Sequence, residues 1–136
     1  MLETKILTKL EQLTYYYEKF SVFLPSSLEV YQKSLKDQMA IERLFQVSIE
    51  CMTDISFSLV KLLHLGVPSD ENNVFDLLDS KFENGEKYKE MRGFRNVLVH
   101  QYAKINNDIV YKYATEKVSD IQDFIAEVKK ILRDFK

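Results

Sequence analysis

The chain has 136 residues, 46% of them hydrophobic, with only three glycines and two prolines; this is enough apolar material for one folded domain and excludes a disordered chain. The 19 basic and 21 acidic residues give a net charge of −2, so any nucleic-acid site must be a local patch. Cys51 has no second cysteine to pair with, which excludes a disulfide or a cysteine-based metal site within the chain.

The composition also bears on where the protein works. A single unpaired cysteine suits a reducing compartment. The first six residues carry charges too early for a signal-peptide core, and no run approaches the ~20 apolar residues of a membrane helix. We therefore expect a soluble cytoplasmic protein.

Apolar residues recur at helical spacing along most of the chain, and short Gly, Pro, Ser and Asn stretches separate the periodic segments. The predicted helices cover residues 2–20, 28–35, 37–65, 74–82 and 86–99, with a final helix from about 115 to 135. The breaks fall at 25–27, 66–68, 84–85 and 105–108. This pattern predicts an all-α fold, an up-and-down bundle of four main helices plus short ones.

Candidate capping residues precede three of these helices. Ser26 or Ser27 can cap the second helix, Asn72 or Asn73 the helix at 74–82, and Thr115 the last one.

The densest cluster of reactive side chains lies at the end of the predicted helix 86–99. Residues 95–102 read Arg-Asn-Val-Leu-Val-His-Gln-Tyr, which places a permanent cation, an imidazole and a phenol within eight residues. The guanidinium of Arg95 matches phosphate geometry, and His100 can move protons near neutral pH. These residue types suit phosphodiester cleavage.

The pattern Arg95-x4-His100-x-Tyr102, with Asn96 directly after the arginine, resembles the signature of the HepT-like branch of the HEPN (higher eukaryote and prokaryote nucleotide-binding) families. The order of upstream segments is similar as well, so the resemblance covers nearly the whole chain; these segments are 46–50, 54–55, 66–68 and 74–78. It implies one HEPN-like domain over residues 1–136.

The resemblance also implies an activity and a partner. HepT-like toxins are endoribonucleases in which the 2′-hydroxyl of the RNA attacks the phosphate and leaves a 2′,3′-cyclic phosphate. Arg95 would stabilise the developing charge and His100 would transfer the proton. Tyr102 would be the tyrosine to which an MntA-type nucleotidyltransferase antitoxin adds AMP. RNA such as tRNA or mRNA would be the substrate, and DNA would be spared because it lacks the 2′-hydroxyl.

No metal or cofactor is expected. His64, His100 and Cys51 lack the spacing of a metal site, and His64 by itself is best interpreted as an ordinary surface or core residue.

The apolar side chains of the helix at 86–99 cover about 200° of its surface, from Tyr88 through Met91, Phe94 and Leu98 to Tyr102, which is more than one core requires. A second copy related by a two-fold axis would cover the excess apolar surface of this helix. We therefore expect a homodimer, as the resemblance also implies. The alternative is a helix surrounded by neighbours within its own bundle.

Arg95 falls inside this apolar arc, where an unpaired cation is costly, so we expect an acidic partner or a wet cleft. Glu50 and Asp54 are the candidates, because they continue a polar line with Arg43 and Gln46 along the helix 37–65. The alternative to a catalytic Arg95 is a structural ion pair that only orients two helices.

His100 presents a geometric difficulty, because it lies about 140° around an ideal helix from Arg95 and about 40° from Asn96. The side chains of Arg95 and His100 would meet if the helix loosens near Val99, if the Arg95 side chain leans across, or if two motifs face each other across a dimer. Asn96 would then support the site by orienting the imidazole or a phosphate oxygen.

Four further cations surround the motif, and they form either an RNA-binding patch or a solvated helix face: Lys87, Lys89, Arg92 and Lys104.

Two functions are therefore compatible with the sequence. One is the endoribonuclease toxin. The other is a non-catalytic HEPN module that binds a nucleotide or positions a substrate for a separate nucleotidyltransferase.

Overall fold

The computed structural model describes residues 1–99 and 105–135, and within them it contains seven helices and no strand. This confirms the all-α prediction. The helices are α1 (Leu2–Phe23), α2 (Leu28–Lys33), α3 (Leu35–Leu62), α4 (Glu71–Leu77), α5 (Gly85–Val99), α6 (Asn107–Glu116) and α7 (Ser119–Phe135).

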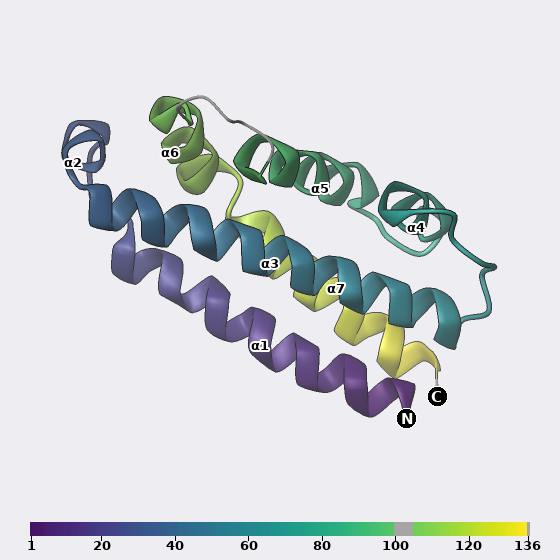
Figure 1. The fold of residues 1–136 in the computed structure, drawn as a ribbon. Coiled ribbons are helices and arrows are strands. Elements are labelled where there is room, and N and C mark those ends of the chain that lie inside the picture. The colour runs from purple at the N-terminus through teal and green to yellow at the C-terminus, as the bar shows by residue number, and fades with distance from the viewer. Residues whose placement is uncertain (100–104, 136) are drawn as a thin grey trace.

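The long helix α3 is the central element of the bundle (Figure 1). It runs antiparallel to α1 and also contacts α2, α4, α5 and α6. Helix α7 packs against α1 and α5 on another side. Helices α4, α5 and α6 therefore form a row along one side of α3, while α1 lies along the opposite side (Figure 1).

Serine caps define the first short helices. The side chain of Ser27 accepts a hydrogen bond from the backbone N–H of Val30, which confirms the predicted cap of α2. Ser34 then accepts from the N–H of Asp37, so α3 begins at Leu35 rather than at Asp37. Because a serine at an N-cap satisfies a backbone donor that has no partner in the helix, Ser34 separates α2 from α3 without Gly or Pro.

The predicted cap and limits of α4 were wrong. Asp70 is the N-cap, and its carboxylate accepts from the N–H of Asn73 at 2.7 Å. The side chain of Asn73 instead accepts from the backbone N–H of Ser69 at 3.0 Å. This reciprocal pair begins the helix three residues earlier than predicted, and α4 ends at Leu77.

A helix was missed where the sequence suggested only a turn. The side chain of Asn106 accepts from the N–H groups of Asp108 and Ile109, and so caps α6. Thr115 lies inside α6 and donates its hydroxyl to the carbonyl of Lys112, so its prediction as a helix cap was wrong.

Helix α3 ends at Leu62, before the predicted glycine stop. His64 takes a left-handed φ of 54° and Gly66 a φ of 119°. A left-handed residue just beyond the last turn is a common helix end, although a non-glycine residue is less usual there. His64 is exposed, as expected for a surface residue.

An aromatic cluster fixes α5 in the bundle. The ring of Phe94 on α5 stacks on Tyr113 of α6 with centroids 4.0 Å apart, and its edge meets Phe45 of α3 at 5.2 Å. One turn and a half earlier, Tyr88 contacts Phe124 of α7 at 5.1 Å. Aromatic pairs at such separations add stabilisation beyond that of the buried area. Helix α5 is therefore held from three sides.

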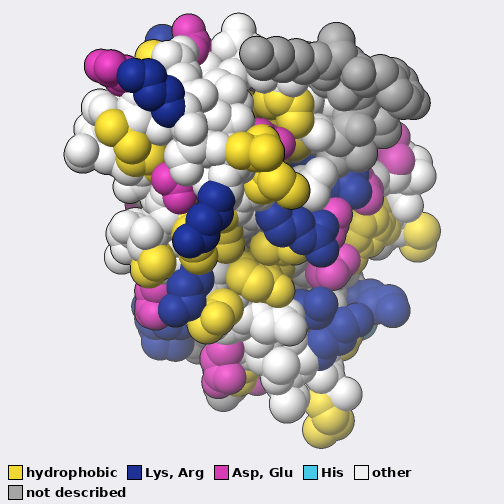
Figure 2. Space-filling model, turned by 60° about the vertical axis from the view of Figure 1, so that its left-hand side comes forward, with side chains coloured by type: hydrophobic (Ala, Val, Ile, Leu, Met, Phe, Trp, Pro, Cys, Tyr) yellow, Lys and Arg dark blue, Asp and Glu magenta, His cyan; other side chains and the backbone are white. Residues whose placement is uncertain are grey.

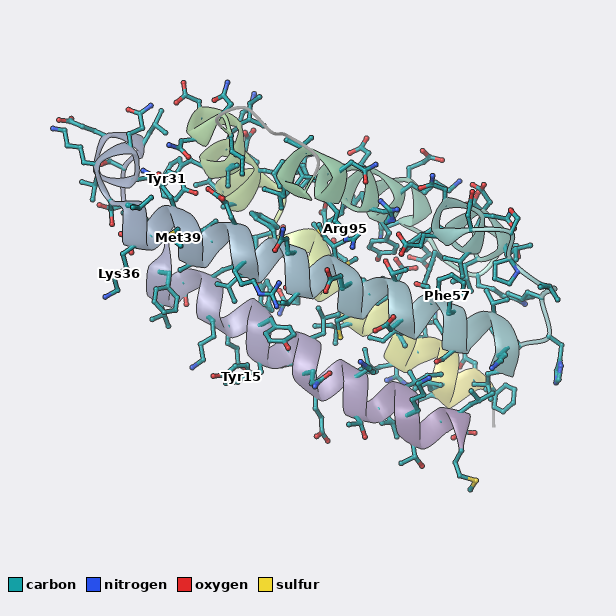
Figure 3. All side chains as sticks on the ribbon, in the orientation of Figure 1. Tyr15, Tyr31, Lys36, Met39, Phe57 and Arg95 are labelled. Carbon is teal, nitrogen blue, oxygen red and sulfur yellow. The ribbon has the colours of Figure 1, made fainter. Side chains whose placement is uncertain are left out.

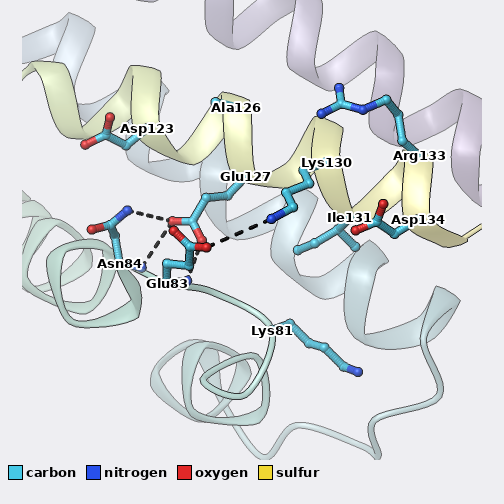
Figure 4. Close-up of a pocket in the computed structure, with 10 residues that line it drawn as sticks. All are labelled: Lys81, Glu83, Asn84, Asp123, Ala126, Glu127, Lys130, Ile131, Arg133 and Asp134. Atoms are coloured by element: carbon cyan, nitrogen blue, oxygen red, sulfur yellow. Dashed lines mark hydrogen bonds and ion pairs between the residues drawn. The ribbon is translucent and has the colours of Figure 1, made fainter.

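The start of α5 is anchored by a carboxylate from α7 (Figure 4). Glu127 accepts hydrogen bonds from the backbone N–H groups of Glu83 and Asn84 at 2.5 and 3.2 Å. It also accepts from the side-chain amide of Asn84 at 3.1 Å and from the buried hydroxyl of Tyr88. The carboxylate thus satisfies backbone donors next to the first turn of α5.

The surface mixes residue types. Hydrophobic side chains lie directly beside Lys and Arg side chains on the face shown in Figure 2. Among the helices of residues 1–99 and 105–135, none combines the length and hydropathy of a membrane span.

Candidate functional site

Arg95 lies on the face of α5 that is turned toward α3, between two carboxylates (Figure 3). Its Nη2 is 3.4 Å from Oε1 of Glu50 on α3, and its Nη1 is 3.7 Å from Oε2 of Glu71 on α4. The side chain keeps 23% of its exposure, and its buried Nε has no hydrogen-bond partner among residues 1–99 and 105–135. Both contacts are longer than the 2.7–2.9 Å typical of a strong charge-assisted bond. Arg95 therefore retains capacity for another anion.

The predicted acidic partner Glu50 is thus confirmed by position, whereas Asp54 is not brought to Arg95. Asp54 pairs with Lys9 of α1 at 3.4 Å. The polar line on α3 divides between two neighbours, because Glu50 contacts α5 while Asp54 contacts α1.

Glu71 was missed in the sequence, although it contacts both arginines of α5. Its Oε2 is 2.5 Å from Nη2 of Arg92 and also faces Arg95. Glu71 is the first residue of α4, directly after the Asp70 cap. The misplaced start of α4 hid this position, and the only signal for it was the capping pattern itself.

Arg92 is held more tightly than Arg95. Its side chain is 10% exposed, and besides Glu71 it donates from Nη1 to Oδ1 of Asn96 at 3.3 Å. A buried guanidinium requires a counterion, so Glu71 serves Arg92 first and Arg95 second. Asn96, predicted to support the imidazole, is exposed and uses its oxygen for Arg92.

Besides Arg92, two more of the cations proposed as an RNA patch already have acidic partners. Lys87 lies 3.9 Å from Asp120 and 3.5 Å from Asp123. Lys89 contacts Asp79 and Asp76 at 2.6 and 3.0 Å, and these hydrogen bonds raise its pKa above the usual lysine value. Their positive charge is largely compensated locally, which favours the alternative of a paired, solvated helix face.

The described part of the apolar arc, from Tyr88 to Leu98, is covered by the chain itself. Tyr88, Met91, Phe94 and Leu98 are all buried within the one bundle, and Val97 is half-buried. The alternative of a helix surrounded by its own neighbours accounts for these residues, so the width of the arc no longer requires a second copy.

Three predicted site residues, His100, Tyr102 and Lys104, lie outside the described residues. The convergence of Arg95 with His100 stays a prediction. In residues 1–99 and 105–135, no three His, Cys, Asp or Glu side chains are grouped so that they could hold a metal ion.

The described part of the site is therefore the partly exposed guanidinium of Arg95 with two carboxylates at 3.4 and 3.7 Å, near the end of a helix that is fixed from three sides. A phosphate oxygen can replace a carboxylate oxygen on a guanidinium with the same geometry. The arrangement can bind a phosphodiester and stabilise added negative charge.

Known proteins with similar sequences are described as ribonucleases. A family model described as "Ribonuclease HepT-like" matches residues 9–128. The chain is 28% identical over 100 residues to a protein named mRNA nuclease HepT of Shewanella oneidensis, covering 71% of this chain and 74% of that protein. It is 29% identical over 125 residues to a putative RNase of Archaeoglobus fulgidus, covering 86% and 92%.

Solved structures share the fold. A tri-AMPylated HEPN toxin of Shewanella oneidensis, in complex with an MNT antitoxin, superposes with a TM-score of 0.83 at 22% identity, covering 92% of this chain and 96% of that one. The cytosolic protein YutE of Bacillus subtilis superposes with a TM-score of 0.81 at 19% identity, covering 97% and 91%.

Proposed function

The chain belongs to the HepT-like ribonuclease family, and we propose that it is the toxin half of a toxin–antitoxin pair that cleaves RNA without a metal ion. The observation that carries this proposal is the placement of Arg95. Arg95 lies four residues before the end of α5, keeps part of its surface open and precedes His100 by five residues.

In the proposed reaction the 2′-hydroxyl of one ribose attacks the adjacent phosphate. His100 accepts the hydroxyl proton or returns one to the departing 5′-oxygen, and the bond from phosphorus to that oxygen breaks. Arg95 stabilises the extra negative charge on the phosphate oxygens. The products are a 2′,3′-cyclic phosphate and a free 5′-hydroxyl. In this proposal the side chains of His100 and Arg95 act without a metal or cofactor.

Glu50 supports this role by keeping Arg95 at the α3–α5 seam. Because its contact with Arg95 is 3.4 Å, a phosphate can compete for the guanidinium without first breaking a short ion pair. Asn96 holds Arg92, and through it the Arg92–Glu71 pair that lies beside the site.

The proposed assembly is a cytoplasmic homodimer with an MntA-like nucleotidyltransferase as antitoxin. The relative from Shewanella oneidensis was solved as an AMPylated toxin with an MNT antitoxin, and we propose the corresponding modification at Tyr102. An adenylyl group would bring a negative phosphate near Arg95 and exclude RNA.

One experiment tests the proposal. Purified protein is incubated with end-labelled RNA in excess EDTA, beside Arg95→Ala, His100→Ala and a sample co-expressed with an adjacent nucleotidyltransferase. We expect cleavage to survive EDTA, to fall at least about 100-fold in both variants and to disappear in the adenylated sample. Arg95→Lys keeps the charge without the planar fork and should retain a small part of the activity.

The cleaved ends and the fold provide the controls. The products should carry 2′,3′-cyclic phosphate, and circular dichroism should show folded variants. RNA that binds equally to all forms but is never cut would instead establish the non-catalytic module.

A further inference from the structure

A groove between α1 and α3 differs in charge from the other surface hollows. This α1–α3 groove has a volume of about 520 Å³, and its lining includes Tyr15, Tyr16, Lys19, Arg43, Leu44 and Val47. No carboxylate contributes to the lining. By contrast, the hollow of about 500 Å³ between α7 and the loop before α5 includes Glu83, Asp123, Glu127 and Asp134 (Figure 4).

Within the part of the chain that the structure describes, the two cations of the groove have no acidic partner. Arg43 is exposed and donates only to the neutral amide oxygen of Gln46, at 3.3 Å. Lys19 lies with its Nζ 4.8 Å from the centre of the Tyr15 ring. Unlike Lys87 and Lys89, which carboxylates surround, these two cations present uncompensated charge to a ligand. A chain whose net charge is −2 thus has a local positive field here.

Aromatic surface lies beside that charge. Tyr15 is 57% exposed, and its ring meets Tyr16 edge to face at 6.1 Å. Cations combined with exposed aromatic rings are the usual means by which proteins hold single-stranded nucleic acid, because the cations contact phosphates while any base can stack on a ring.

Helix α3 lies between the groove and the candidate site and contributes residues to both. Arg43 and Glu50 are seven residues apart on the same exposed face of the helix, which corresponds to about 10 Å along its axis. Glu50 contacts Arg95. Figure 3 shows Tyr15 and Arg95 on opposite flanks of α3. Because the strand must also cross α3, a rise of ~3.4 Å per stacked nucleotide places the groove at least about three nucleotides from Arg95.

The charge argues against a second copy as the occupant. In a two-fold contact centred on the groove, Lys19 and Arg43 would face the same cations of the partner. A polyanion is complementary to this lining, whereas an identical groove is not.

We propose that the α1–α3 groove is a binding subsite for the RNA strand, holding nucleotides at least about three positions away from the phosphate at Arg95. The inference rests on the proposed function and adds the path that the substrate takes. It also shifts the RNA-binding surface from Lys87 and Lys89 to Lys19, Arg43 and the adjacent tyrosines.

The test compares two charge-matched double variants. Lys19→Gln/Arg43→Gln removes the cations of the groove, and Lys129→Gln/Arg133→Gln removes two cations from α7. Binding of a fluorescent 12-nucleotide single strand with 2′-O-methyl riboses, which cannot be cleaved through the 2′-hydroxyl, is followed by anisotropy at several salt concentrations. We expect the groove variant to weaken binding at least about tenfold and to reduce the slope of log K against log salt by about 1.4, with the α7 variant within about twofold of the original protein.

A cleavage comparison separates this inference from the proposed function. The groove variant should lose kcat/KM on the 12-nucleotide RNA but retain it on a dinucleotide, which is too short to reach the groove. If the original protein cleaves RNA and both double variants bind and cleave equally, the subsite is refuted while the nuclease stands. If the groove variant alone weakens binding but no form cleaves, the nuclease is refuted and the subsite remains.

Three other outcomes would overturn the subsite. These are no RNA binding by the original protein, equal loss on the dinucleotide, and conversion of the groove variant to single chains in sedimentation, which would make the groove a contact between copies.

Discussion

Arg92 and Arg95 show how position decides what the same side chain can do. They are one turn apart on α5 and share Glu71, yet Arg92 has a 2.5 Å ion pair and little exposure while Arg95 has longer contacts and an open side. Removing the partner of a buried cation costs far more than removing that of an exposed one. Arg92 is therefore the structural cation of the pair, and Arg95 is the one available to a ligand.

Cys51 shows the corresponding effect of burial on a nucleophile. Its thiol is 4% exposed and donates to the carbonyl of Lys9 at 3.2 Å. Burial raises the pKa of the thiol from 9.0 to about 11, although the positive charge of Lys9 partly opposes the rise. Because the unfolded thiol ionises first, this residue lowers the stability of the fold as the pH rises from about 9 to 11.

We therefore predict that Cys51 is inert in the folded protein. At pH 8 a thiol-disulfide reagent should react with it at least about 100-fold more slowly than with the same chain in urea, since two pKa units reduce the thiolate fraction about 100-fold and burial limits access. The release of the chromophore measures both rates. Equal rates would show that α1 and α3 open freely around the thiol.

The sequence was sufficient to predict Glu50 as an acidic partner of Arg95, but not Glu71. Helical spacing on α3 places Glu50 on a definite face, whereas the position of Glu71 depends on a loop and on where a seven-residue helix begins. The pairing of Lys87 with Asp120 and Asp123 was equally hidden, because those carboxylates come from α7, more than 30 positions away.

Among the elements, α5 is held at its start by contacts from a distant part of the chain. Glu127 of α7 accepts hydrogen bonds from two backbone N–H groups, an amide and a buried hydroxyl at the start of α5. Desolvation and the adjacent carboxylate raise the pKa of Tyr88 above its usual value, so its hydroxyl remains a donor at any physiological pH.

We predict that Glu127→Ala lowers the free energy of unfolding by about 2 kcal/mol, because it leaves buried donors without their charged acceptor. Urea denaturation followed by circular dichroism measures the change. Glu116→Ala, an exposed glutamate at the end of α6, is the matched control and should stay within about 0.5 kcal/mol of the original protein. A similar small effect in both variants would mean that solvent replaces the carboxylate of Glu127.

The long helices could be predicted from the sequence, whereas a short helix could be missed. The long amphipathic helices α1, α3, α5 and α7 are evident from their periodicity. Helix α6 was missed because Asn106, Asn107 and Asp108 are typical of turns, and only the hydrogen bonds accepted by the side chain of Asn106 make them a helix start.

At the scale of the whole molecule, the exposed apolar residues of α3 are the surface to consider for the proposed homodimer. Met39 is 62% exposed and Phe57 36%, and both are labelled in Figure 3. On an ideal helix they lie about 40° from Arg43, on the side of Glu50 rather than of the α1–α3 groove. A dimer formed there would leave the groove accessible and bring two copies of Arg95 toward one seam.

We predict a particle of twice the 16.1 kDa chain mass in sedimentation velocity. Phe57→Glu should convert it to single chains, because a charge buried in the contact would lack a partner. Val67→Glu, at a 93% exposed position in the loop after α3, should leave the dimer intact. Single chains in the original protein at micromolar concentration would refute the dimer.

The clamp formed by Glu127 also has a consequence for translation. A ribosome adds Arg95 more than 30 residues before Glu127, so a nascent chain carries the guanidinium before the carboxylate that steadies the start of α5 has been synthesised. The arrangement described around Arg95 is therefore completed only after α7 has emerged.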